Sequence, residues 1–506
     1  MASYISPLAR AVKVNPDAEA IVDDEVRLTY AELNKRCERL AGALDDLGLQ
    51  PGDRVAVLAR NSHRYLEAYI AIPAAGYVIV PLNIRHTVAE LRYILGDARP
   101  RVLLTDQDAS QLKDLFERVI EIPSAYEMLL DQASPRDLRE NPPDGSSIAG
   151  LFYTGGTTGQ SKGVVLTHDS LIANATYILM SMQYDASTRF GLITPMFHSG
   201  GNVWLFPIIW AGGCCVTLPS FEAGAALDLF QREKVTRSFG ITTMFSMLAE
   251  EQLRQPRDIS ALLDIGHAGQ PCPDEVLRRG CRAFPDARIW TCFGTTETTG
   301  ATTIMQDDER FLLESGSPRL GSCGQAAVGG VEIKIVRDEG TEAATGEVGE
   351  VAVRGGNVMK EYWNKPEQTA AALKDGWYYT GDLGYVDKQQ YVFLVDRKKD
   401  MIISGGENVY STEVETVLYR HPAVLEAAVF GVPDEKWGEA VHAVVVLRSP
   451  VTERELVEYC REHIAGYKVP KHIDIREAPL PKSGPGKILK QILKKPFWES
   501  QKLSIH

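Results

Sequence analysis

The chain has 506 residues, of which 44% are hydrophobic and 24% are charged, with 43 Gly and 27 Pro. This length predicts about three domains' worth of folded chain with ordinary apolar cores, which excludes a disordered or collagen-like protein. The 54 Lys and Arg residues against 67 Asp and Glu give a formal net charge of −13. That charge argues against a nucleic-acid partner, because phosphates attract a positive surface.

The cysteines and the apolar segments indicate the cellular compartment of the protein and whether it spans a membrane. The eight cysteines show no C-x-x-C spacing and are sparse for the length, so we expect neither a zinc site nor disulfides, and a reducing, cytoplasmic location. Met1–Arg10 lacks the pattern of a secretory signal. Segment 191–221 holds no Asp, Glu, Lys or Arg, but three prolines and two Gly-Gly pairs interrupt it. We therefore expect no integral membrane segment there, but buried core and a pocket wall.

The first 110 residues alternate helical and extended patterns. Thr29-x-x-Glu32 has the spacing of a capping box, and apolar residues follow it at helical steps until Gly48. The same alternation predicts further helices at 63–75 and 90–95, and strands at 55–58, 77–80 and 102–105. Short, continuous apolar strands between helices are typical of parallel sheets covered on both faces, so the fold class is α/β.

The pattern changes after about residue 320. Short β-rich runs with Gly-rich turns, such as 332–335 and 350–353, predict an antiparallel or barrel-like subdomain. The charged stretch Asp396–Asp400 separates two apolar runs and is a candidate linker, beyond which an α+β pattern follows. We expect a large lobe at 1–395, a linker at 396–400 and a small domain at 401–506.

The strongest local signal is the Gly/Thr-rich segment Tyr153–Gly163. Its glycines let backbone N–H groups face an anion, its threonines add donors and Lys162 adds a positive charge, which together suit a phosphate. It is not a Walker A loop, because Lys162 is followed by Gly163 and a β-like run rather than by a helix. The alternative is an ordinary hairpin tip.

Six segments in chain order resemble the motifs of the acyl-adenylate-forming (AMP-binding) superfamily, in its acyl-CoA and aryl-CoA synthetase branch. They are Tyr153–Gly163, Pro195–His198, Phe293–Glu297, Tyr379–Asp382, Asp396–Ile402 and Pro481–Lys487. The resemblance covers nearly the whole chain. It implies a large N-terminal adenylation lobe with two α/β sheets and a barrel-like subdomain, and a small mobile α+β C-terminal domain.

The resemblance implies an ATP-dependent acid:CoA ligase. Such an enzyme joins a carboxylic acid to ATP as acyl-AMP with release of pyrophosphate, and then transfers the acyl group to coenzyme A. Lys487 would stabilise the charge of the first step, while His198 and Thr296 would contact the reacting groups. Glu297, with Thr158, would hold Mg²⁺, which prefers hard oxygen ligands.

The nucleotide and the thiol have their own expected contacts. Phe293 takes the place of the tyrosine that usually stacks on adenine, and Asp382 with Arg397 resembles the ribose clamp. Lys399 lies in the stretch 396–400, which resembles the hinge of the family, and glycines beyond it would admit the pantetheine thiol. The expected cofactor-binding residues are Thr154, Gly155, Gly156, Thr157, Thr158, Gly159, Lys162, Gly269, Gln270, Pro271, Phe293, Gly294, Thr295, Asp382, Arg397, Lys399, Gly405 and Gly406.

The acid and the acceptor are less defined. His198 stands where amino-acid-activating relatives carry Asp, and no carrier-protein segment follows, so a simple acid and CoA are favoured. The expected pocket residues are Gly200, Trp204, Phe239, Met244, Cys292 and Ala301. Trp204 would shorten the pocket and favour a short or medium-chain or compact aromatic acid. Loading of a carrier protein and long-chain fatty acids remain alternatives, and a monomer and a homodimer are both open. In the Gly/Thr-rich segment, Gly155 and Ser161 stand where the family more often has Ser and Pro. We expect this difference to affect the affinity for ATP rather than the type of reaction.

Replacement of Lys487 tests the assignment of the first half-reaction. We expect Lys487→Ala to abolish pyrophosphate release while sparing much of the transfer from supplied acyl-AMP to CoA, because the charge that the lysine offsets develops only during adenylation. Both half-reactions are assayed separately. Unchanged pyrophosphate release in this variant would remove Lys487 from the reaction.

Overall fold

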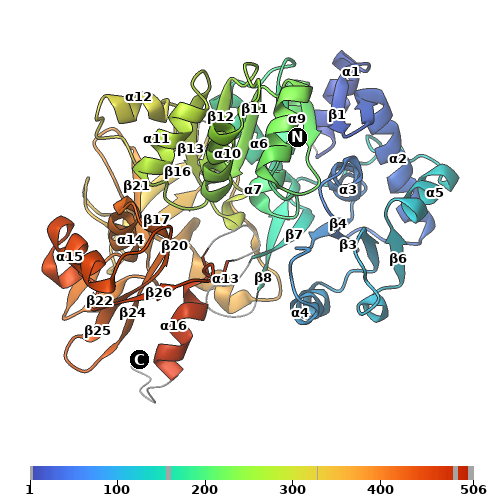
Figure 1. Cartoon of the computed structure of the whole chain (residues 1–506). Helices are drawn as coiled ribbons and strands as arrows, with labels where there is room; N and C mark the ends of the chain where they lie inside the picture. Colours follow the sequence, from blue (N-terminus) through green and yellow to red (C-terminus); the bar gives the residue numbers. More distant parts are fainter. Residues whose placement is uncertain (1–3, 155–160, 328, 483–487, 500–506) are drawn as a thin grey trace.

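The computed structural model describes residues 4–154, 161–327, 329–482 and 488–499. Within these ranges the chain forms four β-sheets with helices packed on them, so the expected α/β class is confirmed. Figure 1 shows the first two sheets and their helices as one large body, with the last part of the chain, in red, at its lower left.

The first sheet has the strand order β18-β8-β7-β4-β3-β5-β6. Strands β7, β4, β3, β5 and β6 run parallel, whereas β8 pairs antiparallel with β7 and with β18. The predicted strands at 55–58, 77–80 and 102–105 are confirmed as β3, β4 and β5. The bounds are β3 (Arg54–Leu58), β4 (Val78–Pro81), β5 (Val102–Thr105), β6 (Arg118–Glu121), β7 (Ile148–Thr154), β8 (Lys162–Thr167) and β18 (Glu361–Tyr362).

The second sheet has the order β15-β14-β13-β12-β11-β9-β10-β1-β2, with parallel strands from β13 to β1. Its carboxyl ends carry the loops that follow β11, β12 and β13. The bounds are β1 (Glu19–Asp23), β2 (Val26–Thr29), β9 (Arg189–Leu192), β10 (Cys214–Thr217), β11 (Arg237–Ile241), β12 (Asp264–Ala268), β13 (Arg288–Phe293), β14 (Thr303–Ile304) and β15 (Gln325–Ala326).

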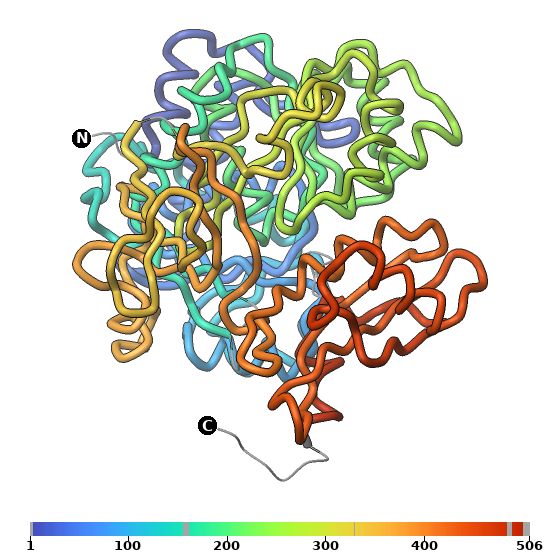
Figure 2. Tube along the Cα trace, turned by 90° about the vertical axis from the view of Figure 1, so that its left-hand side faces the viewer, coloured from blue at the N-terminus to red at the C-terminus, as the bar shows by residue number. Residues whose placement is uncertain are grey.

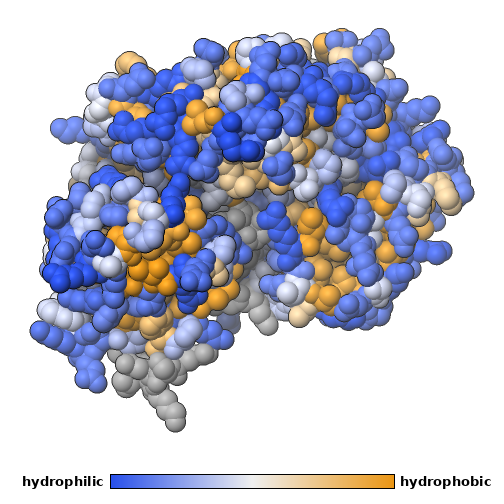
Figure 3. Space-filling view, in the orientation of Figure 1, coloured by the Kyte–Doolittle hydropathy of each residue, from blue (hydrophilic) through white to orange (hydrophobic). Residues whose placement is uncertain are grey.

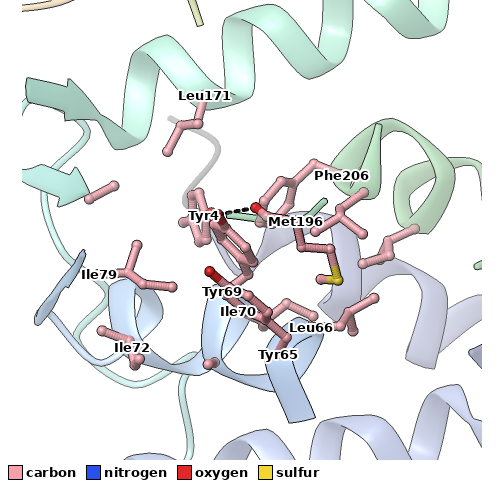
Figure 4. Close-up of a cluster of buried hydrophobic side chains, with 14 of the residues drawn as sticks. Tyr4, Tyr65, Leu66, Tyr69, Ile70, Ile72, Ile79, Leu171, Met196 and Phe206 are labelled. Atoms are coloured by element: carbon pink, nitrogen blue, oxygen red, sulfur yellow. Dashed lines mark hydrogen bonds between the residues drawn. The ribbon is translucent and has the colours of Figure 1, made fainter. Parts of the chain in front are cut away.

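The largest hydrophobic core lies between these two sheets. It joins Ile79 of the first sheet to Phe190 and Trp290 of the second through helices whose apolar faces meet there, and Figure 4 shows one part of it. Thr29, Thr87 and Thr167 cap three of the helices through capping boxes, as predicted for Thr29. The helices of this lobe are α1 (Ser6–Val14), α2 (Tyr30–Asp46), α3 (His63–Ala74), α4 (Val88–Ala98), α5 (Ser124–Gln132), α6 (His168–Met182), α7 (Ser199–Asn202), α8 (Leu205–Ala211), α9 (Ala223–Glu233), α10 (Thr242–Arg254), α11 (Asp274–Ala283) and α12 (Glu309–Glu314).

A third, antiparallel sheet follows, as the β-rich runs after residue 320 predict. Its order is β16-β17-β20-β19, with β21 paired to the other end of the long, irregular strand β20. Helix α13 (Pro366–Ala372) lies between its strands in the chain. The bounds are β16 (Glu332–Val336), β17 (Gly349–Arg354), β19 (Leu373–Lys374), β20 (Trp377–Val386) and β21 (Val392–Arg397).

The chain beyond the charged stretch forms a fourth sheet with a hydrophobic core of its own, set apart from the large body in Figure 2. Its order is β23-β22-β25-β24, with β26 parallel to β25. The expected hinge begins inside β21, which ends at Arg397. The elements are β22 (Ile402–Ser404), β23 (Glu407–Val409), α14 (Ser411–Arg420), β24 (Val424–Asp434), β25 (Gly438–Leu447), α15 (Glu453–His463), β26 (His472–Arg476) and α16 (Lys490–Glu499).

The charge-free segment 191–221 runs through the end of β9, helices α7 and α8 and strand β10, and most of its residues are buried. In the described parts of the chain, no helix combines the length and the apolar character that crossing a membrane requires. The segment therefore supplies core, as its broken apolar pattern predicts, and its part in a pocket wall stays a prediction.

Candidate active site

The Gly/Thr-rich segment connects β7 to β8. Thr154 and Lys162 pair across this hairpin, so both ends of the segment are placed, whereas Gly155, Gly156, Thr157, Thr158 and Gly159 lie outside the described residues. The ammonium group of Lys162 lies over the ring of Tyr362, 4.5 Å from its centroid. A cation over an aromatic face is attracted by the π-electrons, so this contact holds Lys162 at the end of the hairpin.

Glu297 lies in a short 3₁₀ turn, Thr296–Thr298, directly after β13. Its Oε1 accepts a hydrogen bond of 2.8 Å from the Tyr362 hydroxyl, and its carbonyl accepts one of 2.7 Å from the N–H of Met359. Gly294 is required before the turn, because a Cβ there would overlap the carbonyl oxygen of Gly300. The turn is therefore braced from the segment that leads into β18.

Thr296 joins this turn to the segment that carries His198. Its hydroxyl lies 3.1 Å from the Ser199 hydroxyl. The Nδ1 atom of His198 accepts a 3.1 Å hydrogen bond from the N–H of Gly200. In the neutral imidazole the proton is then on Nε2, which makes Nε2 a donor suited to a carboxylate.

A buried polar clamp holds the residues before His198. The Asn61 side chain accepts from the N–H of Met196 at 2.7 Å and donates to the carbonyl of Thr194 at 2.8 Å. The hydroxyl of Tyr69 donates to the carbonyl of Met196 at 2.6 Å, the dashed contact in Figure 4, and Asn202 donates to that hydroxyl. These bonds satisfy backbone groups in an apolar surrounding and thereby fix the path of the chain into His198.

Asp382 and Arg397 face each other on adjacent strands. They are paired residues of β20 and β21, with 3.1 Å between the Arg397 Nε and the Asp382 Oδ1. Asp382 is largely buried, so its carboxylate has a defined position. A carboxylate of this kind can accept from two neighbouring hydroxyl groups, as the ribose of a nucleotide offers.

Lys399 extends this group toward Lys162. Its Nζ is buried and has no hydrogen-bond partner among the described residues. Burial lowers the pKa of Lys399 from its ordinary 10.5 to about 8; the charges of Asp400 and Asp382 raise it, and those of Arg397 and Lys162 lower it. Lys399 therefore lies close to both the ribose candidate Asp382 and the hairpin lysine.

The expected acid pocket is filled by aromatic side chains. Trp204 is only 1% exposed and packs against Phe239, Trp290 and Phe190 at ring-centroid distances of 4.9, 5.4 and 5.8 Å. Gly200 lies one helical turn before Trp204, and Ala301 and Cys292 belong to the same core. Met244 belongs to a different core, with α9 and α11, so the structure does not bring it to Trp204.

Other expected residues lie at the edges of this group or beyond it. Gly269, Gln270 and Pro271 follow β12, and the carbonyl of Gln270 accepts from Thr242. Phe293 is mostly buried in the core of the third sheet, which leaves little of its ring exposed. Gly405 and Gly406 form the β22–β23 turn, where the N–H of Gly405 donates to the carbonyl of Trp437. Lys487 lies outside the described residues.

The donors present fit a magnesium ion bound together with a nucleotide. Among the described residues, no three His, Cys, Asp or Glu side chains gather into a metal site. Mg²⁺ commonly takes one or two protein carboxylates and completes its shell with phosphate oxygens and water. Glu297 is a single carboxylate with one oxygen already held by Tyr362, which suits that arrangement.

Two residues of this site, Tyr362 and Asn61, lie outside the sequence motifs. Tyr362 is far from Glu297 in the chain, and Asn61 precedes the segment it holds by more than 130 residues. The sequence contains one signal for Asn61, its place directly after the buried strand β3, where polar residues of parallel sheets gather. For Tyr362 no such signal exists, because only strand pairing brings it to the site.

Comparison with known proteins defines the family. A sequence model of the AMP-binding enzyme family matches residues 8–363, and one of the AMP-binding enzyme C-terminal domain matches 413–487. The chain is 38% identical over 497 residues to a feruloyl-CoA synthase of an Amycolatopsis species, covering 97% of this chain and 98% of that protein. The chain belongs to the AMP-binding enzymes.

Two further relatives show the spread of this family. Identity is 32% over 503 residues to the long-chain-fatty-acid–CoA ligase FadD13 of Mycobacterium tuberculosis, with 97% of both chains covered. The solved structure of O-succinylbenzoate coenzyme A synthetase from Bacillus subtilis with ATP and magnesium ion has a TM-score of 0.87 and 32% identity, covering 96% of this chain and 99% of that one. The family expected from the six motifs is thus confirmed.

The low pKa of Lys399 predicts a pH dependence of ATP binding. Below about pH 8 the side chain is protonated and attracts the phosphates; as the pH rises from 7 to 9 it becomes neutral. We expect the ATP dissociation constant to increase roughly three- to tenfold over this range, and this increase to be absent in Lys399→Met. Isothermal titration calorimetry at each pH measures it.

The adjacent, exposed Lys398 pairs with Asp338 and Glu350 and supplies the control variant Lys398→Met. That variant is expected to retain the pH dependence. An equal weakening in Lys399→Met and in the unmodified protein would assign the effect to another group.

Proposed function

We propose that this protein is an ATP-dependent acid:CoA ligase that forms an acyl-adenylate and transfers the acyl group to coenzyme A. The observation that carries the proposal is the meeting of a hairpin lysine, a braced glutamate and an Asp–Arg pair at one place. Lys162 and Glu297 share Tyr362, and the charges of Lys162 and Asp382 both act on the buried Lys399. These groups match the phosphates, the cation and the ribose of a nucleotide.

Each residue of the site has its own role in the first step. An oxygen of the acid attacks the α-phosphorus of ATP and pyrophosphate leaves, so negative charge gathers on the phosphate oxygens. Lys162 and Lys399 supply positive charge, while Glu297 with Thr158 would hold Mg²⁺, which neutralises phosphate charge. His198 donates from Nε2 to the acid, and Asp382 fixes the ribose. Lys487, which lies outside the described residues, would offset charge in the same step.

In the second step the thiol of coenzyme A attacks the acyl carbonyl and AMP leaves. We propose that the small domain at 401–506 turns about residues 396–400 between the two steps, with Gly405 and Gly406 lining the path of the thiol. Support comes from the separate core of this domain and from the positive φ angles of both glycines. Trp437 packs on Gly405 beside Lys436 and Lys471, which gives this surface positive charge.

We propose a compact aromatic or short to medium-chain acid as the substrate. An acyl group that enters past Gly200 would meet Trp204, whose ring is enclosed by other aromatic rings and leaves no depth beyond it. The feruloyl-CoA synthase relative is named for a compact aromatic acid, whereas the FadD13 relative is named for long-chain acids. The packing of Trp204 favours the first class.

The cysteines, sparse and without pairing pattern, favour a cytoplasmic location.

Pyrophosphate release across a panel of acids tests the function. Acetate, hexanoate, benzoate, a set of cinnamates and palmitate are each supplied with ATP and Mg²⁺, with and without CoA. We expect release with a cinnamate, benzoate or hexanoate, and a thioester only when CoA is present. Adenylation without thioester formation would favour a carrier protein as acceptor, and no release with any acid would contradict the ligase activity.

Truncation of Trp204 tests the depth of the pocket. We expect Trp204→Ala to raise kcat/KM for decanoate or palmitate by tenfold or more relative to the unmodified protein, because the indole would no longer end the pocket. The same change creates a cavity and should cost about 3 to 5 kcal/mol of stability. The chemically milder Trp204→Leu provides a folded alternative. A preference of the unmodified protein for palmitate would refute the short pocket.

A further inference from the structure

The position of Tyr362 follows from strand pairing. Tyr362 ends β18, an edge strand of two residues whose partner is β8, and it lies opposite Val164. Lys162 stands two residues before Val164 on β8, so its side chain points to the same face of the sheet and reaches diagonally across to Tyr362. The N–H of Trp363 donates to the carbonyl of Gly163 at 2.7 Å, which holds the edge strand in this register.

Tyr362 contacts two charged groups of the site at once. Its hydroxyl donates to Glu297 at 2.8 Å, and its ring face receives the ammonium of Lys162 at 4.5 Å. The side chain is 6% exposed, and its hydroxyl also interacts with Tyr378.

The ring separates two opposite charges. Among the ion pairs of the described residues, none joins Lys162 to Glu297, although both contact the same tyrosine. A direct pair would neutralise both groups and leave neither for a nucleotide or a cation. The cation–π contact provides an alternative partner for Lys162 that does not consume its hydrogen-bond donors.

The hydroxyl fixes one oxygen of the carboxylate. With Oε1 engaged by Tyr362, the other oxygen of Glu297 is left for a monodentate bond, the kind a near-octahedral Mg²⁺ accepts from a single carboxylate. Groups that hydrogen-bond to a metal ligand orient it, and their loss typically lowers metal affinity about 10- to 100-fold. The backbone brace from Met359 to Glu297 comes from the same segment of the chain.

We propose that Tyr362 is a positioning residue that sets both the magnesium carboxylate Glu297 and the phosphate-binding Lys162, with its hydroxyl acting on the first and its ring on the second. The proposal rests on the proposed function only in naming Mg²⁺ and ATP as the ligands. One contribution comes from the hydroxyl of Tyr362 and the other from its ring, and two substitutions distinguish them.

Tyr362→Phe removes the hydroxyl and keeps the ring. We expect the affinity for Mn²⁺, measured in the presence of ATP by electron paramagnetic resonance without turnover, to fall about tenfold or more. The affinity for ATP without metal should stay within twofold of the unmodified protein. In the activity assay the Mg²⁺ concentration for half-maximal pyrophosphate release should rise, while kcat at saturating Mg²⁺ changes little.

Tyr126→Phe is the matched control. The hydroxyl of Tyr126 donates to the buried Glu67 at 2.7 Å, in the helical part of the lobe, so the same atom is removed from a tyrosine–glutamate pair that is more deeply buried than Tyr362 and Glu297. We expect a loss of stability at least as large and no change in Mn²⁺ affinity. An equal loss of Mn²⁺ affinity in both variants would show a general structural effect and overturn the proposal.

Tyr362→Leu removes ring and hydroxyl together. We expect it to weaken ATP binding without metal by about fivefold or more, a loss that Tyr362→Phe does not show, since only the ring contacts Lys162. Should this variant not fold, Tyr362→Met removes the ring and the hydroxyl with a longer apolar side chain, and Tyr362→Phe still tests the hydroxyl. Unchanged Mn²⁺ affinity in Tyr362→Phe refutes the role of the hydroxyl. If no acid supports pyrophosphate release while Mn²⁺ and ATP still bind normally, only the proposed ligase activity is contradicted.

Discussion

The pairing of β8 with two antiparallel partners is the constraint on which the site depends. On one side β7 closes the hairpin that positions Lys162, and on the other β18 brings in Tyr362 from nearly 200 residues further along the chain. Through Tyr362 and the Met359 N–H, the same edge reaches Glu297 at the end of β13 in the other sheet. Strand pairing thereby holds Lys162 beside Tyr362, and the Tyr362 hydroxyl and the Met359 N–H hold Glu297 to them.

The distribution of charge explains why individual positive groups matter at this site. The protein carries a net charge of −13, so its overall field opposes the approach of ATP and coenzyme A. The positive charges that we propose for nucleotide binding are therefore local and individually placed: Lys162 over an aromatic ring, Arg397 against Asp382, and Lys399 buried with a lowered pKa. Such groups have little freedom, which reduces the reorganisation needed when charge develops during the reaction.

The sequence predicted the elements of the fold well, because capping boxes and apolar periodicity are local properties. Thr29 begins α2 and the apolar run at 55–58 forms β3, as expected. The motifs led to the family, and through it to the proposal that Glu297, Asp382 and Arg397 bind the nucleotide. The same approach placed Met244 beside Trp204, yet the two lie in different cores, since alternation along β11 and the start of α10 decides which side of the sheet a residue faces. Phe293 is 8% exposed, and its stacking on adenine stays a prediction.

The sequence by itself determined the α/β class, the family and most residues that carry charge in the site, since these depend on short motifs and on composition. Only the tertiary structure decided that Tyr362 joins Lys162 to Glu297, that Asn61 and Tyr69 hold the chain before His198, and that Trp204 is enclosed by three other rings. The physical reason is that these contacts join residues far apart in the chain, and their geometry follows from strand register and core packing rather than from local sequence.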